Sequence, residues 1–191
     1  MNNIKKILGL VILFACFSCT MVSCDSDNSS SDDGSITWNK LYRNMYGTYK
    51  GNVTLNNNLK QSVTFTVDSF TVIKNLPIEN IIKAAFPSDY ENVTASSSEI
   101  TLTTRNDSIY TYTSSLYKIT MLDQLVSFDV TLNGQKKTIS VLYKIAGIFV
   151  YGTNLFSLYI KADEIMIGST SVDLTNKTVE YTIDSAQKQE E

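Results

Sequence analysis

The chain has 191 residues, with 16 basic and 19 acidic side chains, a formal net charge of −3, three cysteines and no histidine. A mildly acidic chain without a cluster of Lys or Arg is a poor match for nucleic acid, because nucleic-acid binding depends on neutralising phosphates. The lack of histidine excludes Ser-His-Asp and Cys-His catalysis and removes the commonest zinc ligand. We therefore predict a protein that binds no nucleic acid, metal or cofactor.

The N-terminus has the layout of a secretory signal peptide. Lys5 and Lys6 form a charged start, and an apolar run follows over residues 7–17. A membrane-spanning helix needs about 20 apolar residues, so this run is too short to cross a bilayer. We predict a signal peptide over residues 1–23 that is removed after export.

The cysteine at position 24 matches the end of a lipoprotein signal. Residues 21–24, Met-Val-Ser-Cys, resemble the bacterial lipobox, in which an apolar residue stands three positions before the cysteine and a small residue directly before it. Cys19 is a competing site with a poorer match, because Cys16 and Phe17 precede it. An ordinary secretory peptide is the alternative. We expect Cys24 to carry the lipid, which would make the membrane a partner of the mature protein.

The segment after Cys24 is polar and acidic. Residues 25–34 contain no apolar side chain and four acidic ones. Such a segment cannot bury surface and stays disordered, so we predict a tether over residues 24–35. Acidic residues directly after the lipidated cysteine also resemble the surface-export signal of Bacteroidetes lipoproteins, although a plain solvated spacer would look the same. We expect an outer-membrane location, with the cell surface slightly favoured over the periplasmic face.

One folded domain is predicted over residues 36–185, and it begins with a helix at about 37–46. The helical spacing comes from Trp38, Leu41, Tyr42 and Met45, with a capping hydroxyl at Thr37 or Ser35 before them and Gly47 after them. The single Trp lies on the apolar face of this helix. We expect Trp38 to pack on the domain as a plug rather than to serve as an exposed ligand platform.

The next segment alternates with the period of a strand. Residues 48–55 and 59–67 are separated by three asparagines, and pairing Gly51 with Val63 and Val53 with Gln61 keeps the apolar side chains on one face. A third strand is expected at 70–73.

A second helix is predicted over about 77–86, where apolar residues share one face between the only two prolines of the chain, Pro77 and Pro87. A loop, residues 88–98, leads back to strands.

The remainder is a series of strands. Two are expected at 99–104 and 109–113, joined by a turn at 105–108. The clearest hairpin joins 126–132 to 135–145 through Asn133-Gly134, which suits a type I′ turn and sets Phe128 opposite Ile139 and Val126 opposite Val141. Further strands are predicted at 147–152, 155–162, 164–168 and 177–183. Residues 186–191 are predicted to be a polar tail.

This pattern predicts an all-β fold, an antiparallel lipocalin-like barrel or a two-sheet sandwich with two short helices. The lipobox, the helix with Trp38, the sequence Gly-Thr-Tyr-Lys-Gly at 47–51 and residues 74–82 resemble the small Bacteroidetes outer-membrane lipoproteins with a lipocalin-like (calycin-like) β-barrel of unknown function. The resemblance covers most of residues 36–184 in layout. It implies the fold and the location, and this family offers no catalytic residues to carry over.

Two functions fit such a monomeric domain. A barrel of this size can hold a small lipophilic or glycan ligand, and Tyr110 and Tyr112, on one side of their strand, could stack on it. The alternative is an accessory lipoprotein that binds another envelope protein. Tyrosine also suits strands for purely structural reasons. Asp107-Ser108-Ile109 and Asp184-Ser185-Ala186 resemble the Bacteroidetes O-glycosylation motif, which makes Ser108 and Ser185 candidate modification sites.

An enzyme is the third hypothesis, and we do not expect one. A glycoside hydrolase needs only two carboxyl groups flanking the scissile bond. The candidates, mostly at predicted turns and strand ends, are Asp68, Glu79, Asp89, Glu91, Glu99, Asp107, Asp123, Asp129, Asp163 and Glu164. Asp163 and Glu164 are adjacent, so on a regular strand they would point to opposite faces.

Overall fold

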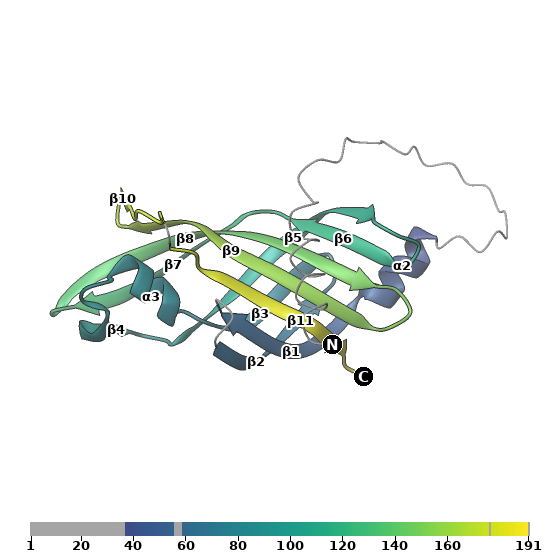
Figure 1. The fold of residues 1–191 in the computed structure, drawn as a ribbon, viewed down its shortest axis with the longest axis horizontal. Coiled ribbons are helices and arrows are strands. Elements are labelled where there is room, and N and C mark those ends of the chain that lie inside the picture. The colour runs from purple at the N-terminus through teal and green to yellow at the C-terminus, as the bar shows by residue number, and fades with distance from the viewer. Residues whose placement is uncertain (1–36, 56–58, 176, 191) are drawn as a thin grey trace. The chain divides into compact units, whose positions relative to one another are not determined.

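Strands dominate residues 37–55, 59–175 and 177–190, which the computed structural model describes (Figure 1). The elements are, in chain order, α2 (Trp38–Met45), β1 (Gly47–Leu55), β2 (Leu59–Val67), β3 (Phe70–Pro77), α3 (Glu79–Ala85), the 3₁₀ helix η2 (Tyr90–Asn92), β4 (Val93–Ala95), β5 (Glu99–Thr111), β6 (Leu116–Met121), β7 (Gln124–Leu132), β8 (Gln135–Val150), β9 (Leu155–Ile167), β10 (Thr170–Ser171) and β11 (Glu180–Lys188). The predicted signal peptide, Cys24 and the tether lie outside the described residues.

Eight of these strands close into an antiparallel barrel in the order β9, β11, β1, β2, β3, β5, β6, β8 and back to β9. Closure follows from the pairing of β8, which bonds β6 along one edge and β9 along the other. The predicted all-β fold is therefore confirmed, and the barrel replaces the sandwich alternative. Residues 36–191 form one compact unit.

The two predicted hairpin registers are confirmed. Gly51 pairs with Val63 and Val53 with Gln61 in β1 and β2. In β7 and β8, Val126 pairs with Val141 and Phe128 with Ile139. The turn residues Asn133 and Gly134 have positive φ angles of 50° and 78°, as a type I′ turn requires.

Several predicted strand breaks are absent. Residues 105–108 were expected to form a turn, but β5 runs through them, and Asp107 is accommodated as a bulge between the pairs Asn106–Met121 and Ser108–Thr120. In the same way β9 continues through Asp163, the extra residue where the pairing with β8 shifts between Leu142 and Tyr143. A bulge absorbs one extra residue without ending the strand, so polar residues at such points resemble a turn in the sequence.

The predicted polar tail and the predicted loop also need correction. Residues 186–188 belong to β11, where Gln187 pairs with Lys50 and Lys188 with Tyr49. The segment 88–98, expected to be a loop, contains η2 and β4, and β4 pairs with the end of β7. Their polar composition reflects strand positions that face solvent.

β6 and β7 follow each other along the same long partner, β8. The C-terminal half of β8 pairs with β6 as part of the barrel wall, and its N-terminal half pairs with β7. The β7–β8 hairpin therefore runs out past the barrel (Figure 1). α3 lies near this hairpin and α2 lies at the opposite end of the barrel (Figure 1). Both helices bury their apolar side chains, Leu41 and Met45 from α2 and Ile81, Ala84 and Ala85 from α3.

Candidate binding surface

The barrel interior is filled by side chains. Tyr49, Phe65, Phe149 and Phe156 have no solvent-accessible surface. The Tyr49 and Phe65 rings stack with centroids 5.2 Å apart, and the Phe156 ring meets both edge-on. A residue without accessible surface cannot border a void large enough for water, so this part of the interior is closed to a small ligand. A ligand at this part of the barrel must therefore bind on the outside.

α2 presents a row of three aromatic rings to the surface. Trp38, Tyr42 and Tyr46 follow one another at i, i+4 and i+8, with ring centroids 6.5 Å and 5.5 Å apart. Trp38 is 52% exposed, so the prediction that it plugs the domain is wrong. Leu41 and Met45 occupy that inward position instead. We call Trp38, Tyr42 and Tyr46 the aromatic row.

The position of the aromatic row is fixed at both ends of α2. The Thr37 hydroxyl accepts a hydrogen bond from the Lys40 N–H (3.4 Å), which confirms the predicted N-cap. At the C-terminus, Tyr49 donates its hydroxyl proton to the Met45 carbonyl from inside the barrel. Lys188 Nζ donates to the Asn44 carbonyl over 2.9 Å. Helix C-terminal carbonyls lack partners within the helix, so these two side chains hold α2 on the barrel end.

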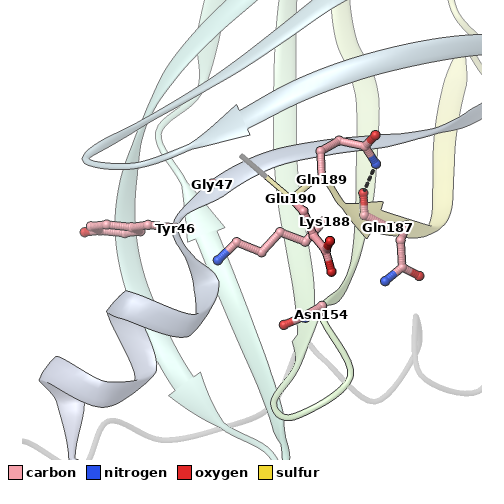
Figure 2. Close-up of a pocket in the computed structure, with 7 residues that line it drawn as sticks. All are labelled: Tyr46, Gly47, Asn154, Gln187, Lys188, Gln189 and Glu190. Carbon is pink, nitrogen blue, oxygen red and sulfur yellow. Dashed lines mark hydrogen bonds between the residues drawn. The ribbon is translucent and has the colours of Figure 1, made fainter.

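A pocket of about 480 Å³ lies beside the C-terminus of α2 (Figure 2). It is lined by Tyr46, Gly47, Asn154, Gln187, Lys188, Gln189 and Glu190. The Lys188 side chain extends across it toward the end of α2 (Figure 2). We call this hollow the Lys188 pocket.

Local backbone geometry builds the Lys188 pocket. Gly47 has a φ of 149°, which L side chains rarely adopt, and a Cβ atom there would lie 2.5 Å from Lys188 Cε, so a side chain at position 47 would push the lysine stem aside. Asn154, in the turn between β8 and β9, has a φ of 56°, and its carbonyl accepts a 3.0 Å hydrogen bond from the Lys188 N–H. The pocket therefore joins the α2–β1 junction, the β8–β9 turn and the end of β11.

The Lys188 pocket is polar and carries both signs of charge. Asn154, Gln187 and Gln189 supply side-chain amides, which both donate and accept hydrogen bonds, while Lys188 donates and Glu190 accepts. Burial, together with the nearby Tyr42 and Asp68, raises the pKa of the Tyr46 hydroxyl, so Tyr46 stays neutral at physiological pH. This arrangement suits a ligand rich in hydroxyl groups better than an ion or a hydrocarbon.

The predicted stacking pair lies elsewhere. Tyr110 and Tyr112 are 48% and 54% exposed, at the end of β5 and just beyond it. Neither tyrosine lines the Lys188 pocket, although β5 is two strands from β8, whose following turn carries Asn154. Lys118 is the cross-strand neighbour of Tyr110. The pair remains a second exposed aromatic surface.

The candidate modification sites differ in accessibility. Ser108 is half-buried, and its hydroxyl donates to Asp107. Ser185 is exposed, with a φ of 50°, in a bulge where the pairing of β11 with β9 shifts between Ile183 and Ala186. Of the two, Ser185 is the more open to a modifying enzyme.

The carboxylates form no metal-binding group within the described part of the chain, because no three His, Cys, Asp or Glu side chains gather there. Asp163 forms a 2.9 Å ion pair with Lys144, and Glu164 accepts from the Ser171 hydroxyl. Both lie outside the core, between the buried Ala162 and Ile165, because of the bulge at Asp163. The expectation that they point to opposite faces is therefore wrong.

Sequence reasoning missed the Lys188 pocket and misread the aromatic row. The spacing of Trp38, Tyr42 and Tyr46 was visible in the sequence. Leu41 and Met45 follow the same helical period, so the spacing did not decide which of these side chains turn toward the barrel. Lys188 and Asn154 carried no local signal, because β-sheet pairing brings them to α2 from more than 100 residues away.

The helices of the described residues are all too short and too polar to cross a membrane. Compared with known proteins, the chain matches no protein-family model, no curated protein and no solved structure.

Proposed function

We propose that the protein is a lipid-anchored, non-catalytic binding module of a bacterial outer membrane, and that it binds a glycan on the outside of its barrel. The observation that carries the proposal is the half-exposed Trp38, which begins a row of aromatic rings that ends at a polar pocket. The glycan site comprises the aromatic row and the Lys188 pocket.

The chemistry of this surface matches a sugar. A pyranose ring has a flat C–H face, which packs on aromatic rings, and a rim of hydroxyl groups, which pair with amides, ammonium and carboxylate groups. Aromatic rings with a polar tip serve both needs. Eight residues of helix separate Trp38 from Tyr46, a rise of about 12 Å. The row therefore offers the length of a short oligosaccharide rather than of a single sugar.

The packed interior favours a glycan over a lipophilic ligand. A lipophile would have to displace the Tyr49, Phe65 and Phe156 rings, which pack on one another without a void. In a core packed this closely, removing even one methylene group lowers stability, so moving three rings aside to open a cavity would cost far more.

The anchor and the location are supported by the sequence. The lipobox-like residues 21–24 favour a lipid on Cys24, and the acidic segment that follows would serve as a spacer of about a dozen residues before α2. The resemblance to Bacteroidetes lipoproteins with lipocalin-like barrels favours the outer membrane and its cell surface. O-glycosylation at Ser185, and at Ser108, is part of the same proposal.

The fluorescence of Trp38 tests the glycan site directly, because it is the single Trp of the chain. A panel of neutral and acidic oligosaccharides is titrated into the protein, and we expect a saturable change in the Trp38 emission for at least one member. Trp38→Ala and Tyr42→Ala should then each weaken binding about tenfold, as measured by calorimetry.

Tyr112→Ala is the matched control, because Tyr112 is as exposed as Trp38 but lies just beyond β5, outside the glycan site. It should leave the affinity unchanged. A loss confined to Tyr112→Ala and Tyr110→Ala would move the site to the predicted stacking pair. No binding by any oligosaccharide in the panel would contradict the glycan proposal.

A further inference from the structure

Three neighbouring strands of the barrel carry no acidic side chain. β1, β2 and β3 lie side by side and contain no Asp or Glu, although the whole chain has 19 acidic and 16 basic residues. They carry basic residues instead, of which Lys50 on β1 and Lys74 on β3 are exposed. We call the outward side of these three strands the basic face.

The strand pairing places Lys50 and Lys74 in one row across the basic face. Thr64 of β2 pairs with Lys50 on one side and with Lys74 on the other. Residues paired across a sheet point to the same side, and this side is the outer one, because the adjacent Tyr49 and Phe65 are buried in the barrel. Neighbouring strands are about 4.8 Å apart, so the backbones of the two lysines are about 10 Å apart.

The charges of Lys50 and Lys74 are not neutralised by neighbours. Elsewhere on the barrel an exposed lysine has an acidic partner, as Lys144 has in Asp163 at 2.9 Å. Neither Lys50 nor Lys74 forms an ion pair within the described residues, and Asp184, on the strand next to β1, does not pair with Lys50. Both ammonium groups are therefore available to a ligand.

The basic face continues the proposed glycan site. Gln187 lines the Lys188 pocket and pairs with Lys50 across β11 and β1. A ligand that leaves the pocket at Gln187 meets Lys50 next, and then Thr64 and Lys74. We propose that the ligand is an acidic glycan, whose carboxylate or sulfate groups bind Lys50 and Lys74. This inference rests on the proposed glycan site and names the class of glycan that the site binds.

The α2 side of the site suits uncharged sugars better than acidic ones. Glu190 lines the Lys188 pocket, and Asp68 is close enough to Tyr46 to act on its hydroxyl. Both carboxylates would repel an anionic group there, and the Lys188 ammonium already donates to the Asn44 carbonyl. A glycan in which acidic and uncharged sugars alternate meets both conditions, because it offers uncharged sugars to the aromatic row and acidic ones to the basic face.

Calorimetry with matched pairs of oligosaccharides tests the class of glycan. The probes are oligosaccharides of hyaluronan and of chondroitin sulfate, each compared with a neutral counterpart that has lost its sulfate groups and has its carboxyl groups reduced to alcohols. We expect at least one acidic probe to bind at least about tenfold tighter than its neutral counterpart. Because both lysines are exposed, this preference should shrink at about 1 M salt, where the screening length is about 3 Å.

Single charge removals locate the acidic part of the ligand. Lys50→Gln and Lys74→Gln should each weaken binding of the acidic probe about threefold, and the double variant about tenfold. None of these variants should change binding of the neutral counterpart. Lys144→Gln is the matched control, because it removes the same charge from an exposed lysine on β8, outside the site, and it should leave both affinities unchanged.

The outcomes separate this inference from the proposed glycan site. Equal binding of acidic and neutral probes would overturn the acidic class and leave the glycan site standing, and so would an equal loss of affinity in Lys144→Gln and in the variants of the basic face. Binding of no glycan at all would contradict the glycan site itself. Vesicles of phosphatidylcholine and phosphatidylglycerol give the last comparison. If vesicle binding requires Lys50 and Lys74 while binding of the acidic probes does not, the basic face binds anionic lipid and the inference is wrong.

Discussion

Two buried tyrosines, Tyr143 on β8 and Tyr181 on β11, differ by one hydrogen bond, and this difference predicts different effects of the same substitution. Tyr143 and Tyr181 are buried with ring centroids 6.4 Å apart. Tyr181 donates its hydroxyl proton to the Pro77 carbonyl over 2.7 Å. The Tyr143 hydroxyl makes no hydrogen bond of ordinary geometry with any described residue, and the Tyr181 hydroxyl, whose own proton goes to Pro77, is the polar group beside it. We compare Tyr181→Phe with Tyr143→Phe.

The magnitude follows from what each hydroxyl leaves behind. Tyr181→Phe removes a bond and strands a buried carbonyl, which should lower the free energy of unfolding by about 1–3 kcal/mol. Tyr143→Phe removes only a buried polar group without a partner, so its stability should stay unchanged or rise by about 1 kcal/mol. For a domain of this size, 1 kcal/mol corresponds to a shift in Tm of about 2–4 °C.

Urea unfolding at neutral pH, followed by Trp38 fluorescence and circular dichroism, measures both variants. Each variant is the control for the other, because both keep the aromatic ring and differ only in the lost bond. The reasoning is refuted if Tyr143→Phe is destabilised as much as Tyr181→Phe, or if Tyr181→Phe is as stable as the parent protein.

Three further predictions concern the barrel and its end. Burial raises the pKa of Tyr49, Tyr143 and Tyr181 well above the usual range. Their contribution to stability is therefore full below about pH 10 and is lost as the pH rises through the folded-state pKa values. A Tm that stays constant between about pH 8 and 11 would contradict this. Gly147→Ala would place a Cβ 2.5 Å from the Phe156 ring and should lower the free energy of unfolding in urea by about 1–3 kcal/mol. An unchanged free energy of unfolding would show that the barrel wall can move to accept the methyl group. Lys188→Met keeps the stem and loses the bond to the Asn44 carbonyl, so it should lower stability by about 0.3–1 kcal/mol, while Lys50→Met, at an exposed position, should have no effect.

The parts of the fold that the sequence predicted are those with local causes. Asn133-Gly134 sets the register of the β7–β8 hairpin through turn geometry alone, and the apolar alternation of β7 and β8 agrees with it. Thr37 caps α2 through a contact three residues away. Closure could not be predicted, because strands in a barrel and in a sandwich have the same alternation, and only the double pairing of β8 decides between them.

The candidate site was less predictable than the fold. Trp38 was expected to be buried because large apolar residues usually are, yet Leu41 and Met45 suffice to cover the barrel end. The Lys188 pocket depends on pairing between β1 and β11, which no short sequence pattern reports. Polar residues at Asp107 and 186–188 resembled a turn and a tail because bulges and exposed strand positions tolerate the same residue types.

The central claim is that this protein binds its ligand on the outside of a filled barrel. Native mass spectrometry of the chain from Asp25 to Glu191, purified gently and then denatured, tests it most directly. We expect the mass of the polypeptide alone in the native spectrum. A lipophilic mass that is retained under native conditions and lost on denaturation would contradict it, because a lipophile suits an enclosed apolar cavity and not the polar Lys188 pocket.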